Sequence, residues 1–399
     1  MNVNKLSIIM PCYNCSETLE EAVVSIYAQN LKISFEVIMV DDGSTDSTRE
    51  LIIKLSKKYK YIKYFFQEQN KGGGVTRNMA VKNSEGNIIF CLDSDDILEE
   101  GVLGKMADYW LSKRCDGVGV STSIKFKNKN IKNTAFINEF SFINEQVPFE
   151  SLFQDPMKCP LYSVFLFTRE AFDMIGGYPE GHGFDTQGFA FRFLANGLVA
   201  YTCPETTYFH RVGFHRSYYI REYEAGKASH NWYSILEEYL FVFSEELQRQ
   251  IIEFDLNKGE VISLVEKSSN KFKNNYKDLI RNNSKQEYKK LVEGGAMDSG
   301  LDYFWIGSEK YRQKKYSEAI TWLIKSIEAG LNQEKIYFKL FDSLCQINNI
   351  SYSEMQKKIN SMFNYRVLGS LSPLHKRAIN KIKKSLNAIY GQISGNNKK

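Results

Sequence analysis

The sequence predicts an α/β fold, with a mostly parallel sheet covered by helices on both faces and an all-α region after it. In the first hundred residues, short apolar runs of strand length alternate with amphipathic segments of helix length. Such alternation is typical of β-α-β units, which place their strands in parallel. From residue 213 onward, apolar residues recur at helical spacing between charged ones. The predicted strands cover residues 7–10, 35–40, 62–66 and 88–92.

The helices between these strands are predicted from capping residues and apolar faces. The first follows Asn14 or Ser16, either of which can cap it. Its apolar face consists of Leu19, Val23 and Ile26. A second helix follows the polar turn 41–47, and a third lies around residues 77–81, after the glycines at 72–74.

Four regions are predicted along the chain. They are an α/β domain at 1–215, a helical extension at 216–295, a repeat-like helical region at 296–365 and a basic amphipathic tail at 366–399. From Asp302 to Leu331, the spacing of Trp, Gly, Tyr and Ala resembles one tetratricopeptide repeat, a helical hairpin of about 34 residues. Because a stable array needs about three such units, we expect a short helical appendage.

Composition and charge narrow the functional classes. A formal net charge of +5 over 399 residues gives no reason to expect nucleic acid as a partner. The chain shows no secretory signal and no apolar run long enough to span a bilayer, so we expect a cytoplasmic protein. Its seven cysteines are scattered. Reduced thiols are therefore expected, rather than a zinc site or redox pair at Cys12 and Cys15.

The tail is basic from Pro373 onward, and apolar residues recur in it every four positions. A helix with this pattern could make a peripheral contact with the inner face of an anionic membrane. Alternatively, its apolar side packs on the rest of the protein.

Polar clusters follow three of the predicted strands, at residues 11–14, 41–44 and 93–96. Ligands of α/β sheets bind outside the carboxyl ends of the strands. The sequence therefore predicts one site that gathers these clusters.

The strongest chemical signal is the pair of carboxylates at Asp93 and Asp95. In an extended chain, side chains at i and i+2 point the same way, so both could face one cation. Mg²⁺ and Mn²⁺ prefer such oxygen ligands, and beside a diphosphate they neutralise charge on the leaving group. Taken alone, the pair could equally be a solvated turn.

Two further segments could bind a nucleotide. Asp41 or Asp42 could accept hydrogen bonds from a base or ribose, although Ser44 or Asp46 of the same loop could simply cap the next helix. Arg77 follows glycines that permit close backbone approach, so its guanidinium could reach a phosphate. The alternative for Arg77 is a surface charge.

Four segments occur in order within the first hundred residues. They are Ser7 to Asn14, Val40 to Asp46, Asn70 to Asn78 and Leu92 to Asp96. Together they closely resemble the family 2 glycosyltransferases, which have the GT-A fold, and the similarity extends less clearly to about residue 215. The resemblance implies an inverting hexosyl- or N-acetylhexosaminyl-transferase of cell-surface glycan synthesis.

The resemblance also implies roles for individual residues. Pro11, Tyr13 and Asp42 would contact the nucleoside, with Asp41 as a neighbour, Arg77 would hold the donor, Asp93 would lie near the ribose and Asp95 would bind Mn²⁺ or Mg²⁺. The donor would be a nucleotide sugar, usually linked to UDP. A glycan, a lipid-linked glycan and a protein all stay open as the acceptor. Proton removal from the acceptor hydroxyl requires a base.

The expected base is where the chain departs from the family. Counting back from Arg192 and Gly197 places Asp185 on the usual Glu and Thr186 on the usual base. A hydroxyl cannot act as a base at neutral pH. We therefore expect Asp185 to take over; Glu180 and weak activity are the alternatives, and Asp185 could also be only a helix N-cap.

The segment 208–211 is similar to a His-containing stretch of the same family. His210 could complete the metal shell or touch the diphosphate, or it could be a structural hydrogen-bonding residue. His215 and Arg216 follow it.

Other classes fit less well. A nucleotidyltransferase or a dinucleotide-binding oxidoreductase needs a glycine-rich loop after the first strand, where this chain has Pro11 to Asn14. A nucleotide-sugar-binding scaffold without catalytic activity fits Thr186 and the repeat-like C-terminal half.

Overall fold

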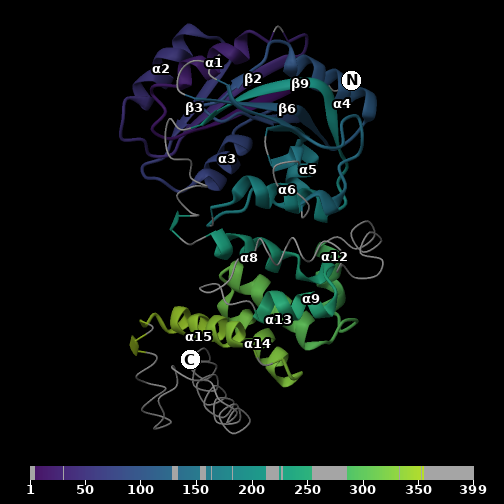
Figure 1. The fold of residues 1–399 in the computed structure, drawn as a ribbon. Coiled ribbons are helices and arrows are strands. Elements are labelled where there is room, and N and C mark those ends of the chain that lie inside the picture. Colours follow the sequence, from purple (N-terminus) through teal and green to yellow (C-terminus); the bar gives the residue numbers. More distant parts are fainter. Residues whose placement is uncertain are drawn as a thin grey trace. The chain divides into compact units, whose positions relative to one another are not determined.

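The computed structural model contains a mixed sheet of nine strands in its described residues, with helices on both faces (Figure 1). The structure describes residues 5–29, 31–127, 134–152, 159–162, 164–181, 183–212, 224–225, 228–253, 285–331, 333–351 and 353–354. The chain divides into two units, residues 1–305 and 306–399.

The first half of the sheet is parallel, in the order β3-β2-β1-β4. Its strands are β1 (Lys5–Cys12), β2 (Ser34–Asp41), β3 (Ile62–Phe66) and β4 (Ile88–Cys91). Its helices are α1 (Leu19–Tyr27), α2 (Thr48–Lys58) and α3 (Gly73–Lys82). All four predicted strands are confirmed, and β1, β2 and β4 are buried on both faces, which explains their continuous apolar runs.

Chain direction places α3 on the face opposite α1 and α2 (Figure 1). The chain moves outward from β1 to β3 and then returns to β4, on the other side of β1. Since such crossovers are right-handed, the returning helix must cover the other face. The gap between β1 and β4 is therefore the switch point at which sheets of this kind bind ligands.

The second half of the sheet is mixed rather than parallel. Its strands are β5 (Ile97–Leu98), β6 (Gly117–Lys127), β7 (Thr134–Glu139), β8 (Phe165–Thr168) and β9 (Ala200–Val212). β8 runs antiparallel to β4 and β6, β9 runs parallel to β6, and β5 and β7 pair antiparallel with β9 and β6. The predicted α/β class is confirmed, and the parallel arrangement holds for the first four strands.

The remaining helices of this half are α4 (Val102–Lys113), α5 (Arg169–Ile175) and α6 (Asp185–Ala195), with short 3-10 turns at Phe149–Leu152 and Pro160–Tyr162. Buried aromatic rings fix α6. Phe189 stacks on Tyr178 with ring centroids 4.1 Å apart and lies 4.9 Å from Phe167. This packing sets the start of α6, where Asp185 lies.

The predicted cap of the first helix is wrong, whereas its predicted buried face is confirmed. α1 has Thr18 as its N-cap residue. Asn14 instead adopts a left-handed backbone (φ 48°), and its side chain accepts a hydrogen bond from the amide of Thr45 (2.8 Å). Similarly, the amide of Ser16 donates to Asp46 (3.2 Å), so both predicted caps belong to the loop contacts of the site.

Residues 228–293 are helical where described: α8 (Ala228–Glu238), a 3-10 turn (Leu240–Val242), α9 (Glu245–Glu253) and α12 (Lys285–Glu293). Then follow α13 (Gly300–Arg312), α14 (Tyr316–Glu328) and α15 (Glu334–Asn348). A Cβ at Gly307 would lie 2.8 Å from the side chain of Leu323, so α13 and α14 approach closely there. The tetratricopeptide resemblance and the predicted domain boundaries stay predictions.

The tail at 366–399 lies outside the described residues, so its membrane contact stays a prediction. Within the described part of the chain, no helix combines the length and apolarity needed to cross a bilayer. All seven cysteines are described, and each is a buried free thiol.

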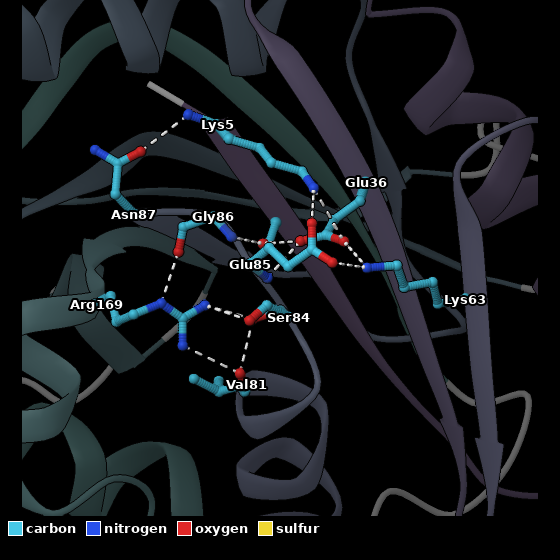
Figure 2. Close-up of polar contacts among 10 residues, drawn as sticks. Lys5, Glu36, Lys63, Val81, Ser84, Glu85, Gly86, Asn87 and Arg169 are labelled. Atoms are coloured by element: carbon cyan, nitrogen blue, oxygen red, sulfur yellow. Dashed lines mark hydrogen bonds and ion pairs between the residues drawn. The ribbon is translucent and has the colours of Figure 1, made fainter. Parts of the chain in front are cut away.

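A buried carboxylate ties together the amino ends of the parallel strands, away from the predicted site (Figure 2). Glu36 of β2 is 2% exposed. Its Oε1 accepts hydrogen bonds from the hydroxyl of Ser7 (2.8 Å) and the amide of Glu85 (2.6 Å). Its Oε2 lies 2.9 Å from the Nζ of Lys63 and 3.4 Å from that of Lys5.

The loop before β4 is held from the other side by Arg169 of α5 (Figure 2). Its guanidinium donates to the carbonyl oxygen of Gly86 (2.7 Å) and to the hydroxyl of Ser84 (2.7 Å). Both networks are structural, because they join strand ends opposite those that carry the polar clusters.

Glu36→Gln should lower the free energy of unfolding at pH 7 by about 1–3 kcal/mol, since it weakens charge-assisted hydrogen bonds. Burial alone would raise the pKa of Glu36, but the Glu85 amide, Lys63, Ser7 and Lys5 outweigh burial and lower it. With a lowered folded-state pKa, the stabilisation is present above the ordinary value of 4.5 and is lost as the pH falls through the folded-state pKa. Urea denaturation at pH 7 and pH 4 measures this, with the exposed Glu50→Gln as control. A difference from wild type that does not shrink at pH 4 would contradict the assignment.

Candidate functional site

The loops that follow β1 and β2 lie against each other at the carboxyl ends of the strands. The amide of Asn14 donates to the hydroxyl of Ser44 (2.9 Å), and the amide of Asp42 donates to the carbonyl oxygen of Cys12 (2.8 Å). Asn tolerates the left-handed backbone that this contact needs. Beside these loops, Tyr13 is 42% exposed and Pro11 is half-buried. Of the three predicted clusters, those at 11–14 and 41–44 therefore meet.

Asp42 holds the loop that contains the glycines at 72–74 against the end of β2 through hydrogen bonds. Its carboxylate accepts hydrogen bonds from the amides of Lys71 (2.7 Å) and Gly72 (3.0 Å) and from the side-chain amide of Gln67 (3.0 Å). Burial raises the pKa of Asp42, although the two backbone amides oppose this. Asp42 is 4% exposed, and these hydrogen bonds occupy its carboxylate inside the protein. Its predicted contact with a nucleoside stays a prediction.

Asp41 has a structural role in the same turn. It is fully buried, pairs with the Nε of Arg49 (2.7 Å) and accepts a hydrogen bond from the amide of Ser44 (3.2 Å). These contacts occupy the carboxylate inside the protein. A contact between Asp41 and the donor stays a prediction.

Arg77 is the centre of the site and is no surface charge. Its side chain is 9% exposed, with Nη2 2.5 Å from the Oδ1 of Asp93 and Nη1 paired with Asp185. The guanidinium also donates from Nε to the thiol of Cys91 (3.3 Å) and lies over the ring of Tyr178. Burial opposes the charge, but Asp185 and Asp93 outweigh it and raise the pKa of Arg77.

The glycines before Arg77 allow α3 to approach α6. A Cβ on Gly73 would lie 2.6 Å from the Nη1 of Arg77 and 2.7 Å from the Oδ2 of Asp185. A Cβ on Gly74 would lie 2.0 Å from the carbonyl oxygen of Pro179. The glycines therefore bring Arg77 and Asp185 together, a role more specific than the predicted approach to phosphate.

Asp185 is the carboxylate that the structure places at the centre. It is the first residue of α6, its side chain is 15% exposed, and the N-cap position belongs to Phe184. The alternative that Asp185 is merely an N-cap is therefore wrong. The hydroxyl of Thr186 donates to Gln187 (3.0 Å), whereas Glu180 is exposed and accepts a hydrogen bond from Asn78 (2.8 Å).

A second acidic cluster, formed by Asp95 and Asp96, follows β4. Residues of β9 hold Asp96 in place through hydrogen bonds. Asp96 is 1% exposed and accepts hydrogen bonds from the amide of Arg211 (3.0 Å) and from the Nδ1 of His210 (3.1 Å). Burial, with added repulsion from Asp96 and Asp93, raises the pKa of Asp95. Burial would lower the pKa of His210, but Asp96 raises it. Carboxylates crowd here, and such crowding favours a bound cation.

Two side chains near Asp96 could contribute ligands to a divalent metal whose other ligands come from a substrate. Within the described residues, no group of three or more His, Cys, Asp or Glu side chains is arranged to hold a metal. The protein can offer the carboxylate of Asp95 and the Nε2 of His210, whose Nδ1 is oriented by Asp96 as in many histidine metal sites. Mg²⁺ commonly binds through one or two carboxylates plus phosphate oxygens. His215 and Arg216 lie outside the described residues.

Three residues around the site could not be assigned from the sequence. Tyr178 lies beneath Arg77, and Lys125 of β6 lies beside His210 in the sheet register. Asp96 was visible as the last acid of the D-S-D-D run, but its role in orienting His210 depends on β9. Neither Tyr178 nor Lys125 belongs to a local pattern that would have identified it.

Part of the chain is similar in sequence to known proteins. Residues 7–173 match the family model described as Glycosyl transferase family 2. An uncharacterized glycosyltransferase of Haemophilus influenzae is 31% identical over 164 residues, which make up 38% of this chain and 65% of the relative. The poly(ribitol-phosphate) β-N-acetylglucosaminyltransferase TarP of Staphylococcus aureus is 31% identical over 137 residues, 34% of this chain and 41% of the relative. The chain thus spans less than two thirds of the length of these relatives.

The crystal structure of Staphylococcus aureus TarS 1-349 in complex with UDP-GlcNAc is similar in fold. The TM-score is 0.50 at 17% identity, over 87% of this chain and 93% of that chain. This similarity confirms the predicted GT-A architecture with a helical C-terminal part. The sequence similarity to the glycosyl transferase family 2 model is confined to residues 7–173.

Proposed function

We propose that the protein is an inverting glycosyltransferase that moves a sugar from a UDP-linked donor to a hydroxyl group of a cell-surface glycan. The observation that carries the proposal is the Arg77 bridge, which brings Asp185 of α6 next to Asp93 at the switch point of the sheet. The named relative and the solved structure involve N-acetylglucosamine and UDP-GlcNAc. UDP-GlcNAc is therefore the first donor to test.

In this proposal, Asp185 takes the proton of the acceptor hydroxyl while the hydroxyl oxygen attacks the anomeric carbon of the donor sugar. The bond from that carbon to the diphosphate breaks on the opposite face, and UDP leaves with the bonding electrons. Arg77 holds Asp185 and Asp93 in place, while Tyr13 and Pro11 line the nucleoside side. Mn²⁺ or Mg²⁺ held by Asp95 and His210 would neutralise charge on the leaving diphosphate.

A donor-binding scaffold without turnover is the competing function. The residue that favours it is Thr186, which by the resemblance takes the place of the usual base and whose hydroxyl donates to Gln187. Asp185, one residue away, could act as the base in place of Thr186, because its carboxylate is held beside the Arg77 guanidinium. The two functions differ in UDP release rather than in donor binding.

A thermal-shift series with UDP-GlcNAc, UDP-glucose and GDP-mannose, with and without Mn²⁺, tests the proposal. A ligand that binds only the folded state raises the melting temperature, so the UDP sugars should raise it more with Mn²⁺. In Asp95→Asn, the manganese-dependent part of this increase should disappear, because one metal ligand loses its charge. Asp108→Asn, an exposed change on α4, should behave like wild type.

The same proteins are then assayed for UDP release with glycan acceptors. Donor binding without release on any acceptor would support the scaffold. If Asp95→Asn fully retains the manganese-dependent shift and turnover, the assignment of Asp95 as a metal ligand is wrong.

A further inference from the structure

Arg211 of β9 is a buried cation beside the turn 93–96, which follows β4. Its side chain has no exposed surface, and its guanidinium lies 4.6 Å from the centre of the Phe126 ring. A buried guanidinium is tolerated only when its N–H groups find acceptors. Two of these acceptors are the carbonyl oxygen of Asp95, 2.9 Å from Nε, and the Oε2 of Glu21 in α1, 2.5 Å from Nη2. Arg211 therefore joins the turn 93–96 to α1.

The main chain of this turn is held at three successive carbonyl oxygens, those of residues 93–95. The groups that donate to them are, in chain order, the amide of Asp96 (3.1 Å), the hydroxyl of Thr18 (3.1 Å) and the Nε of Arg211. Thr18 is the N-cap residue of α1. The helix α1 thus holds the turn at two points, directly through Thr18 and indirectly through Glu21 and Arg211.

The carboxylate of Asp95 depends on this hold of the main chain. The neighbouring carboxylates have partners of their own, since Asp93 pairs with Arg77 and Asp96 accepts a hydrogen bond from the amide of Arg211 (3.0 Å). Within the described part of the chain, no hydrogen bond or ion pair joins the Asp95 carboxylate to another residue. The position of this carboxylate therefore follows from the main chain, whose carbonyl group Arg211 fixes.

We propose that Arg211 is a positioning residue for the transfer reaction, which holds the main chain of Asp95 against α1 and so places the Asp95 carboxylate for the divalent metal. The inference rests on the proposed function, which assigns Asp95 to that metal. Contacts that orient a metal ligand from outside the ligand shell commonly change metal affinity by about ten- to a hundredfold when they are lost. Glu21 acts one step further out, because it orients the guanidinium.

A purely structural role of Arg211 predicts a different result. In that case the arginine would stabilise the packing of β9 beside α1, and its loss would lower the melting temperature without changing the metal affinity. Two measurements on the full chain separate these roles. One is the melting temperature without ligands, and the other is the Mn²⁺ concentration that produces half of the manganese-dependent thermal shift at saturating UDP-GlcNAc.

Glu21→Gln is the decisive variant, because it changes only the charge of a side chain that is 41% exposed. It should raise the half-effective Mn²⁺ concentration about threefold, the range of a partly exposed ion pair, and leave the shift by UDP-GlcNAc without Mn²⁺ unchanged. The matched control is Glu20→Gln on the preceding residue of α1. The side chain of Glu20 is 44% exposed and pairs with Lys58 (2.9 Å) instead of Arg211. At moderate salt, which screens the long-range effect of one surface charge, this control should behave like wild type.

Arg211→Lys keeps the positive charge, but a single ammonium cannot hold the Asp95 carbonyl and Glu21 together as the planar guanidinium does. It should raise the half-effective Mn²⁺ concentration about tenfold. Because Glu21 acts through the guanidinium, the double variant Arg211→Lys with Glu21→Gln should show little further increase. If Arg211→Lys does not fold, Glu21→Gln and its control decide between the two roles.

An unchanged half-effective Mn²⁺ concentration in Glu21→Gln would overturn the positioning role, and so would a lower melting temperature as the sole effect of Arg211→Lys. An equal increase in Glu20→Gln would assign the effect to surface charge and overturn it as well. Failure of the proposed function would appear separately, as absence of any shift by UDP-GlcNAc in the wild-type protein with Mn²⁺. That result would leave Asp95 without a metal to bind and would overturn this role of Arg211 too.

Discussion

Asp185→Asn should lower turnover by about a hundred- to ten-thousandfold, the range supplied by a positioned general base, while leaving the affinity for the donor nearly unchanged. Asparagine keeps the shape of the side chain and can still accept a hydrogen bond from Arg77, but it cannot take the proton of the acceptor hydroxyl. The measurements are UDP release at saturating donor and acceptor, and the thermal shift with UDP-GlcNAc.

Two neighbouring variants separate this role from the alternatives. Thr186→Val removes a hydroxyl that donates to Gln187, and Glu180→Gln removes the charge of an exposed carboxylate that contacts Asn78. Both should retain turnover within a few-fold of wild type. Normal turnover in Asp185→Asn together with a large loss in Glu180→Gln would transfer the role of base to Glu180.

The parallel half of the fold could be predicted because its signals are local. Strands such as β4 are short apolar runs, each followed by a polar loop. Because ligands of α/β sheets bind outside the carboxyl ends of the strands, Asp42 and Asp93 are expected on the same side of the sheet. The mixed half could not be predicted in this way. Its pairings join segments far apart in sequence, and aromatic packing around Phe189 decides where α6 begins.

The site was predicted as a set of residues but not as a set of contacts. Asp185 was found by counting along a family pattern, yet its pairing with Arg77 spans 108 positions and depends on two glycines that carry no visible chemistry. The cap of α1 was missed for a related reason. Asn14 has the right side chain for a cap, but that side chain accepts a hydrogen bond from the amide of Thr45 instead.

Arg77→Met should lower the free energy of unfolding by about 3 kcal/mol, because removing one member of a buried ion pair leaves uncompensated charge. The value lies at the low end of the usual range because the carboxylate of Asp93 is 40% exposed and keeps part of its hydration. Arg77→Lys should recover only part of the loss, since a single ammonium cannot hold two carboxylates as the planar guanidinium does. Urea denaturation without ligands measures the effect, and Arg249→Met, on the exposed face of α9, should change little.

The double variant Arg77→Met with Asp185→Asn tests whether the bridge causes this loss. With Asp185 already neutral, removal of Arg77 leaves only one carboxylate without its partner. The combined loss should therefore be smaller than the sum of the single losses, by about 1–3 kcal/mol. Strict additivity would mean that Arg77 stabilises the domain through its packing on Tyr178 rather than through Asp185. In that case the guanidinium would not be what positions the base.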